Sequence, residues 1–155
     1  MTEATNPAEV SDLYALLGDY YHDLDREADA FAAYDSCLVY NADHISCLNN
    51  YAYYLSLKNE QLERAERMSY RTVKAEPLNK TYLDTYAWIL YMQGNYSMAK
   101  FYIDRTISPS ADDAAVLGME EVSKDVLEHA AAIYEANELG EQAERYRQLA
   151  NQKEE

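Results

Sequence analysis

The stretch 14-YALLGDYYHDLDREADAFAAYDSCL-38 decides how this chain folds, because its pattern returns three more times along the sequence. Its first half carries large and small apolar residues at the spacing of one helix face, namely Tyr14, Leu17, Gly18 and Tyr21. A polar break follows at Leu24-Asp25, and a second helical run continues from there to Leu38. The stretch therefore predicts two helices joined by a short turn.

The same pattern is found at 48-LNNYAYYLSLKNEQLERAERMSYRTV-73, 83-LDTYAWILYMQGNYSMAKFYIDRTI-107 and 127-LEHAAAIYEANELGEQAERYRQLA-150. Three positions define it: a small residue (Gly18, Ala52, Ala87, Ala131), a large one (Tyr21, Leu55, Leu90, Tyr134) and a second small one (Ala30, Ala65, Ala99, Ala143). The first small position recurs after 34, 35 and 44 residues, so the period is about 34 with an insertion before the fourth copy. We expect the small residues to mark the places where the two helices of each pair cross most closely.

These residues resemble the tetratricopeptide repeat (TPR), with the best matches in Tyr14, Leu17-Gly18, Tyr21, Ala30 and Tyr34. The strings LNNYAYYL (48–55) and YLDTYAWILY (82–91) look like those of bacterial TPR proteins of unassigned role. The resemblance implies an all-α, right-handed superhelical solenoid of about four helix-turn-helix repeats, or about eight helices. The repeats would be 11–44, 45–79, 80–113 and 124–155 within one domain (1–155), with an inserted segment at 112–121 that is long enough for one short helix ending at Gly118.

Composition agrees with a folded helical chain. Among 155 residues there are only 4 Gly and 3 Pro, too few for a turn-rich β fold, and the apolar fraction of 48% is too high for disorder. The two cysteines, Cys37 and Cys47, suggest either two buried thiols or one disulfide in an oxidising compartment. Asn6-Pro7 reads as a helix start, with Asn6 as N-cap.

The charge excludes two classes of partner. The formal net charge is −15, so nucleic acid and anionic membrane surfaces should be repelled. Residues 58–80 form a basic exception, which suggests either a solvated helix face or a field that steers a partner. No apolar run is long enough for a membrane span, and the polar, acidic start is unlike a signal peptide. The compartment stays open: cytoplasmic, or exported with a signal removed.

The TPR resemblance implies that the first helices of the repeats line a concave groove that binds a peptide or protein segment, without catalysis and without a cofactor. Carried over position by position, the groove residues for which we expect a binding role are Asn49, Tyr53, Asp84, Trp88, Tyr91, Asp19 and Glu128. Tyr53 and Trp88 occupy equivalent places in adjacent repeats, and no groove position is basic. The expected ligand therefore offers apolar or basic side chains. The alternative is that Tyr53, Trp88 and Tyr91 pack within the superhelix.

Other candidate chemistry is limited to histidines. Asp19, His22 and Asp23 have a spacing that could hold a metal, although a solvated acidic turn is the simpler reading. Glu128-His129 invites an acid–base role, but the pair stands near the start of a repeat helix, where His129 is expected to pack or cap. His44 is expected to cap the inter-repeat turn. Glycine-rich phosphate loops, zinc-protease patterns and nucleophile elbows are absent from the sequence, so we predict no enzyme and no metal site.

The first helix also carries an apolar stripe that would normally face a preceding repeat, formed by Leu13, Leu16, Tyr20 and Leu24. It suggests that the chain belongs to a longer array or that the stripe meets a second copy in a homodimer, and the third, least favourable alternative is a stripe left exposed on a monomer. The sequence thus supports two hypotheses from different classes. The first is a peptide-binding module, and the second is a structural or homo-oligomerisation module with no separate ligand.

Overall fold

The structure, a computed structural model, describes residues 6–153, which form nine α-helices. These are α1 (Pro7–Asp23), α2 (Glu27–Tyr40), α3 (Ile45–Leu57), α4 (Leu62–Ala75), α5 (Lys80–Met92), α6 (Tyr96–Thr106), α7 (Asp113–Gly118), α8 (Lys124–Ala136) and α9 (Gly140–Gln152). Within this described part of the chain, no helix combines the length and the apolar character that crossing a membrane requires.

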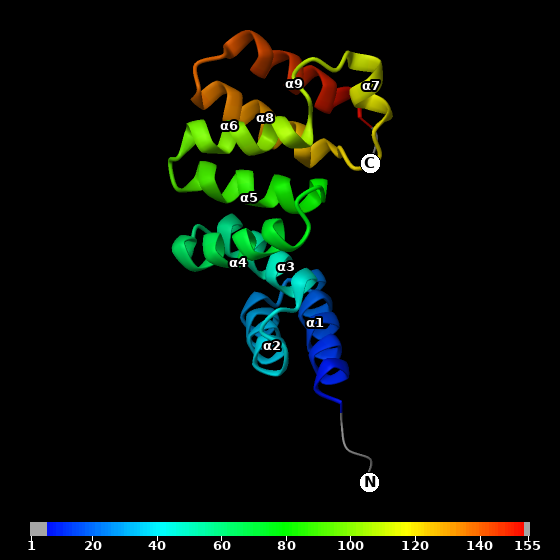
Figure 1. The fold of residues 1–155 in the computed structure, drawn as a ribbon, viewed down its shortest axis with the longest axis vertical. Coiled ribbons are helices and arrows are strands. Elements are labelled where there is room, and N and C mark those ends of the chain that lie inside the picture. Colours follow the sequence, from blue (N-terminus) through cyan, green and yellow to red (C-terminus); the bar gives the residue numbers. More distant parts are fainter. Residues whose placement is uncertain (1–5, 154–155) are drawn as a thin grey trace.

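The helices pair in chain order and the pairs stack along the long axis of the molecule (Figure 1). The pairs are α1/α2, α3/α4, α5/α6 and α8/α9, and α7 lies at the end of the molecule that α9 occupies. The first helices of successive pairs contact one another, α1 with α3, α3 with α5, and α5 with α8. The predicted all-α helical solenoid is therefore confirmed, and one side of it is built from first helices.

The small repeat positions lie where the helices of a pair meet. Ala30, Ala65, Ala99 and Ala143 are fully buried, as are Ala52 and Ala87. Gly18 shows the constraint most sharply, because a Cβ built on it would lie 2.4 Å from Cε1 of Tyr34 on α2. The phenol oxygen of Tyr34 is held by Asp19 at 2.6 Å, so the ring cannot easily move aside.

The turns inside the four pairs share one geometry. The backbone N–H five residues after the recurring large position donates to the carbonyl of that position: Arg26 to Tyr21, Glu60 to Leu55, Asn95 to Leu90 and Leu139 to Tyr134, at 2.9–3.0 Å. The residue before each donor has a positive φ: Asp25 (59°), Asn59 (54°), Gly94 (85°) and Glu138 (62°). This placement identifies the last turn as Asn137-Glu138, with α9 beginning at Gly140. Glycine occupies the left-handed position only once, which explains why so few glycines suffice.

The first helix of each pair begins at a side-chain cap, as does α7, whereas α2, α4, α6 and α9 have none. The side chain of Asn6 accepts from the backbone N–H of Ala8, and Pro7 opens α1. His44 caps α3 by accepting from the backbone N–H of Cys47, as predicted. The cysteine thiols are free and buried, and burial raises the pKa of Cys47 above its ordinary value.

The basic segment 58–80 contacts acidic side chains of α2 and of the turn that follows it. Arg64 contacts Asp35 at 2.9 Å, and Arg71 contacts Asp43. These carboxylates are well exposed, so each pair contributes about 0–1 kcal/mol.

The inserted segment forms the predicted short helix α7, which ends at Gly118. Arg145 of α9 contacts Asp113 at 2.7 Å, and Lys153, directly after α9, donates to the carbonyl of Leu117 at 3.0 Å. The residues that follow Gly118 are thereby carried back toward the first helices.

Candidate functional site

A pocket of about 370 Å³ opens between the first helices of the last three pairs. We call it the groove pocket. Its lining residues come from α3 (Asn49, Asn50, Tyr53), α5 (Thr81, Asp84, Thr85), the segment after α7 (Glu120, Glu121, Ser123) and α8 (Asp125, Val126, His129). The segment after the insertion thus closes one edge of this pocket.

His129 links the three helices at the base of the pocket. Its Nδ1 lies 3.0 Å from Oδ1 of Asp84, with both side chains largely buried, and its Nε2 lies 3.3 Å from the phenol oxygen of Tyr53. A carboxylate only accepts hydrogen bonds, so Nδ1 of His129 donates to Asp84. In the neutral ring Nε2 then accepts from Tyr53, which makes a continuous donor chain from Tyr53 to His129 to Asp84.

Aromatic rings continue the cluster along α5. The Trp88 ring stacks on His129 with centroids 4.2 Å apart, and it also stacks on Tyr91 with centroids 4.7 Å apart. Tyr53 meets His129 edge-on at 5.9 Å. Tyr53, Trp88 and Tyr91 are half-buried, and the Trp88 indole nitrogen is buried without a hydrogen-bond partner. The three rings, from α3 and α5, therefore form one cluster with His129 of α8 while keeping part of their surface accessible.

The pocket is acidic. Four carboxylates line it, from Asp84, Glu120, Glu121 and Asp125, and no lysine or arginine is among the lining residues. The pKa of the Tyr53 phenol is raised above its ordinary value, first by burial and then by the negative charges of Asp84 and Asp125. The tyrosine thus stays a neutral donor in a negative field.

A polar chain runs from α1 to the pocket. The amide nitrogen of Asn50 donates to Asp19 at 3.1 Å, and the amide nitrogen of Asn49 lies 3.4 Å from the amide oxygen of Asn50. Asn49 is 5% exposed, and its own Oδ1 is buried with no hydrogen-bond partner. The pocket wall therefore contains an acceptor that nothing in the described residues satisfies.

The predicted site residues fall into three groups. Asn49, Tyr53 and Asp84 line the groove pocket, and Trp88 and Tyr91 join it through the stack on His129. Asp19 lies at one remove, because it accepts from Tyr34 and from Asn50.

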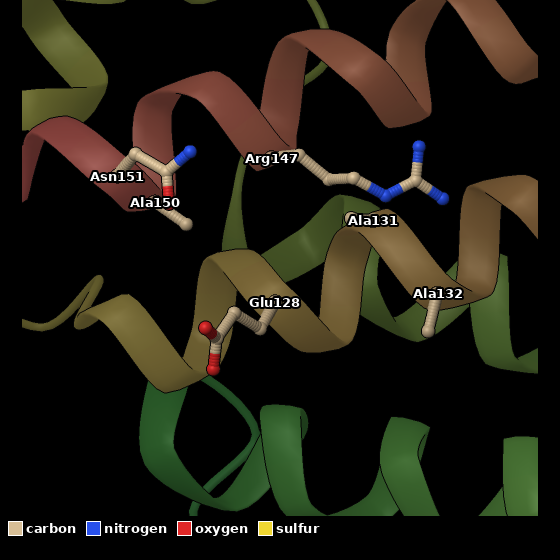
Figure 2. A pocket seen from close by; sticks show the side chains of 6 residues that line it. All are labelled: Glu128, Ala131, Ala132, Arg147, Ala150 and Asn151. Atoms are coloured by element: carbon tan, nitrogen blue, oxygen red, sulfur yellow. The ribbon is translucent and has the colours of Figure 1, made fainter.

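Glu128 is not brought into the groove pocket. It lines a separate hollow of about 360 Å³ between α8 and α9, shown in Figure 2, together with Ala131, Ala132, Arg147, Ala150 and Asn151. Its charge still adds to the negative field at Tyr53.

Three residues of the site escape the sequence reasoning. For His129 the sequence predicts only packing or capping, although its place one turn after Asp125 puts both on the same face of α8. Glu120 and Glu121 belong to the inserted segment, and only their adjacency after Gly118 could have marked them.

His22 lies elsewhere, stacked on Tyr54 at 3.6 Å and bonded to Glu27. Among residues 6–153, no group of three or more His, Cys, Asp and Glu side chains is placed to hold a metal ion.

Solved structures of MamA share the fold of this chain. The MamA MSR-1 C2 structure aligns over 92% of this chain and 75% of its own, with a TM-score of 0.66 and 15% sequence identity. Another crystal structure of MamA aligns over 92% and 77%, with a TM-score of 0.68 and 15% identity. No family model matches the chain, and no curated protein matches its sequence. The comparisons therefore establish a TPR-like helical solenoid, and identity this low carries the fold alone.

Proposed function

We propose that this chain is a protein–protein interaction module that binds a peptide or protein segment along the side built from α3, α5 and α8. The observation that carries the proposal is the half-buried aromatic cluster of Tyr53, Trp88 and Tyr91 beside an open pocket of about 370 Å³. Tyr and Trp are the side chains that most often anchor protein interfaces, because they bury large area with few rotatable bonds.

The lining selects the kind of segment. Aromatic faces and carboxylates are present together, and among the residues that line the groove pocket the only basic group is His129. A segment with apolar and basic side chains satisfies both kinds of surface, and an acidic segment or a terminal carboxylate meets repulsion from four carboxylates.

The variant Tyr53→Ala/Trp88→Ala is expected to lose at least about tenfold in affinity for the bound segment, since removing one anchoring aromatic typically costs 1–2 kcal/mol or more. A partner recovered from native lysate is truncated to the segment that binds, and the affinity of that segment for each variant is measured by calorimetry. Tyr70→Ala/Phe101→Ala provides the matched control, because these aromatics are exposed on second helices. Affinities that agree within a factor of two for the wild type and the Tyr53/Trp88 variant, with helicity intact, contradict the proposal.

Self-association is a second candidate, favoured by the stripe on α1. Leu13, Leu16 and Tyr20 are 65%, 64% and 60% exposed, and Leu24 is 48% exposed. A contiguous apolar stripe of this kind is typical of an interaction surface. Its occupant in this proposal is a second copy of the chain.

Leu16→Glu tests the stripe, because a carboxylate in its centre would have to be desolvated in any dimer. If self-association is the function, light scattering should give a wild-type mass above the 17.8 kDa of one chain, and Leu16→Glu should restore the single-chain mass. Val39→Glu, at a position that is 79% exposed on α2, is the matched control. A wild-type protein that is strictly monomeric would rule this candidate out.

A further inference from the structure

We infer that the groove pocket binds one cationic side chain, the ammonium of a lysine or the guanidinium of an arginine. The inference rests on the proposed function for the source of that side chain, which would belong to the bound segment. The preference for a positive charge is argued from the groove pocket itself. Three features of the lining lead to it.

The first feature is the unpaired acceptor of Asn49. Asp19 can only accept, so the atom of Asn50 that contacts it at 3.1 Å must be the amide nitrogen. The amide oxygen of Asn50 then faces Asn49, which must donate to it with its own nitrogen. This fixed order leaves Oδ1 of Asn49 as the free atom. An unsatisfied buried acceptor is destabilising, and a donor from a ligand would remove that cost.

The second feature is that the carboxylates of the pocket are available. Among the described residues, no lysine or arginine forms an ion pair with Glu120, Glu121 or Asp125, although lysines and arginines form seven ion pairs elsewhere. Asp84 is engaged by His129 alone. Elsewhere in the described part of the chain, six lysines and arginines pair with acids, among them Arg64 with Asp35, and Arg147 with both Glu135 and Glu144. The pocket is thus a place where acids gather and basic partners are missing.

The third feature is the aromatic wall. Tyr53 lines the pocket, and a cation beside its ring gains a further attraction to the π-face. The volume of about 370 Å³ falls in the range of pockets that enclose a small ligand, so a whole side chain can enter. A cationic donor thus matches three parts of this lining: the Asn49 oxygen, the carboxylates and the Tyr53 ring.

The test uses free capped amino acids as probes, so that it does not depend on knowing the segment. Nα-acetyl-arginine methylamide and Nα-acetyl-lysine methylamide are titrated into the full chain and followed by NMR at the Asn49 side-chain amide and the Trp88 indole. The corresponding citrulline and Nε-acetyl-lysine compounds are the uncharged controls of matching length. We expect the cationic probes to bind at least roughly tenfold more tightly than these controls, the difference made by one hydrogen bond to a charged group. Equal binding of charged and uncharged probes, or no shift at Asn49 with any probe, overturns the inference.

Variants sharpen the result. Glu120→Gln/Glu121→Gln changes two exposed rim carboxylates and should weaken the arginine probe several-fold, whereas Glu60→Gln/Glu63→Gln makes the same charge change away from the pocket and should leave it unaltered. Asn49→Ala removes the free acceptor and should lower the affinity for the arginine probe by about tenfold. If the Glu120/Glu121 and Glu60/Glu63 variants weaken binding equally, the effect is the net charge of the protein and the inference fails.

Failure of the inference and failure of the proposed function give different results. A segment whose lysines and arginines are replaced by Nε-acetyl-lysine and citrulline, but which binds unchanged and still depends on Tyr53 and Trp88, overturns the cation pocket and leaves the binding module standing. Selective binding of the free probes, together with segment binding that ignores Tyr53 and Trp88, overturns the module and leaves the pocket standing.

Discussion

Raising the pH above 10.0, the ordinary pKa of tyrosine, is expected to unfold this protein steeply. Tyr34, Tyr86 and Tyr134 are at most 6% exposed, and their hydroxyls donate to Asp19, Glu66 and Asp104. Burial, followed by the hydrogen bond to a carboxylate, raises the pKa of each above its ordinary value. A phenolate in any of these places would be buried against a negative charge.

The direction of the effect follows from proton linkage. Below pH 10 these tyrosines are protonated in both the folded and the unfolded chain, so they contribute their full stability. Above pH 10 the unfolded chain loses the protons while the folded chain keeps them, and the free energy of unfolding falls. Each such group lowers the free energy of unfolding by about 1.4 kcal/mol per pH unit, so three lower it by about 4 kcal/mol per pH unit.

The measurement follows helicity by circular dichroism and phenolate by ultraviolet absorbance over the same alkaline titration. The absorbance of the buried tyrosines should rise only as helicity is lost. Tyr134→Phe removes one of the three groups, so its stability should fall less steeply with pH, by about 1.4 kcal/mol per unit. Complete ionisation of all tyrosines in a chain that keeps its helices would contradict the prediction.

Gly18→Ala is expected to destabilise the protein by about 1–3 kcal/mol, although alanine is the better helix former. The added methyl would lie 2.4 Å from a ring carbon of Tyr34, which is fully buried and tied to Asp19. To make room, α1 and α2 must separate or the Tyr34 hydrogen bond must break. For a chain of this length each kcal/mol lowers the Tm by about 2–4 °C.

Gly140→Ala is the matched control for Gly18→Ala, because Gly140 also lies in a helix and a Cβ there has open space around it. Its stability should stay the same or rise by up to about 1 kcal/mol through helix propensity. Thermal unfolding of both variants, monitored by circular dichroism, provides the comparison. Equal Tm values for the two alanine variants would show that the small position in the first repeat is not sterically required.

Most of the fold could be predicted from the sequence, because its information is local and repeated. The small and large positions recur at a period of about 34, and each copy predicts the same close crossing of two helices. Caps such as Asn6 and His44 bond to backbone groups within three residues, so both partners of each contact lie in the same short stretch of sequence. The fourth intra-repeat turn is harder to locate from the sequence, because its left-handed position is occupied by Glu138 while the nearby Gly140 already belongs to α9.

The candidate site could be predicted only in part. Helical periodicity put Asn49, Tyr53, Asp84 and Trp88 on first helices, at positions that the TPR resemblance assigns to a groove. It could not show that Glu128, on the same type of helix, would line the hollow between α8 and α9 instead. The superhelical rotation from one helix pair to the next decides which side chains converge. That rotation depends on packing throughout the stack.

The sequence by itself determined the repeat, the helix pairs, their small crossing residues and the excess of acid. The tertiary structure alone decided that His129 would join Asp84 and Tyr53, which are 45 and 76 residues away, and that Glu120 and Glu121 would close the pocket. The physical reason is one of range. Periodicity reports contacts within a helix and between neighbouring helices, whereas the pocket arises where three first helices and an inserted segment meet after the solenoid has assembled.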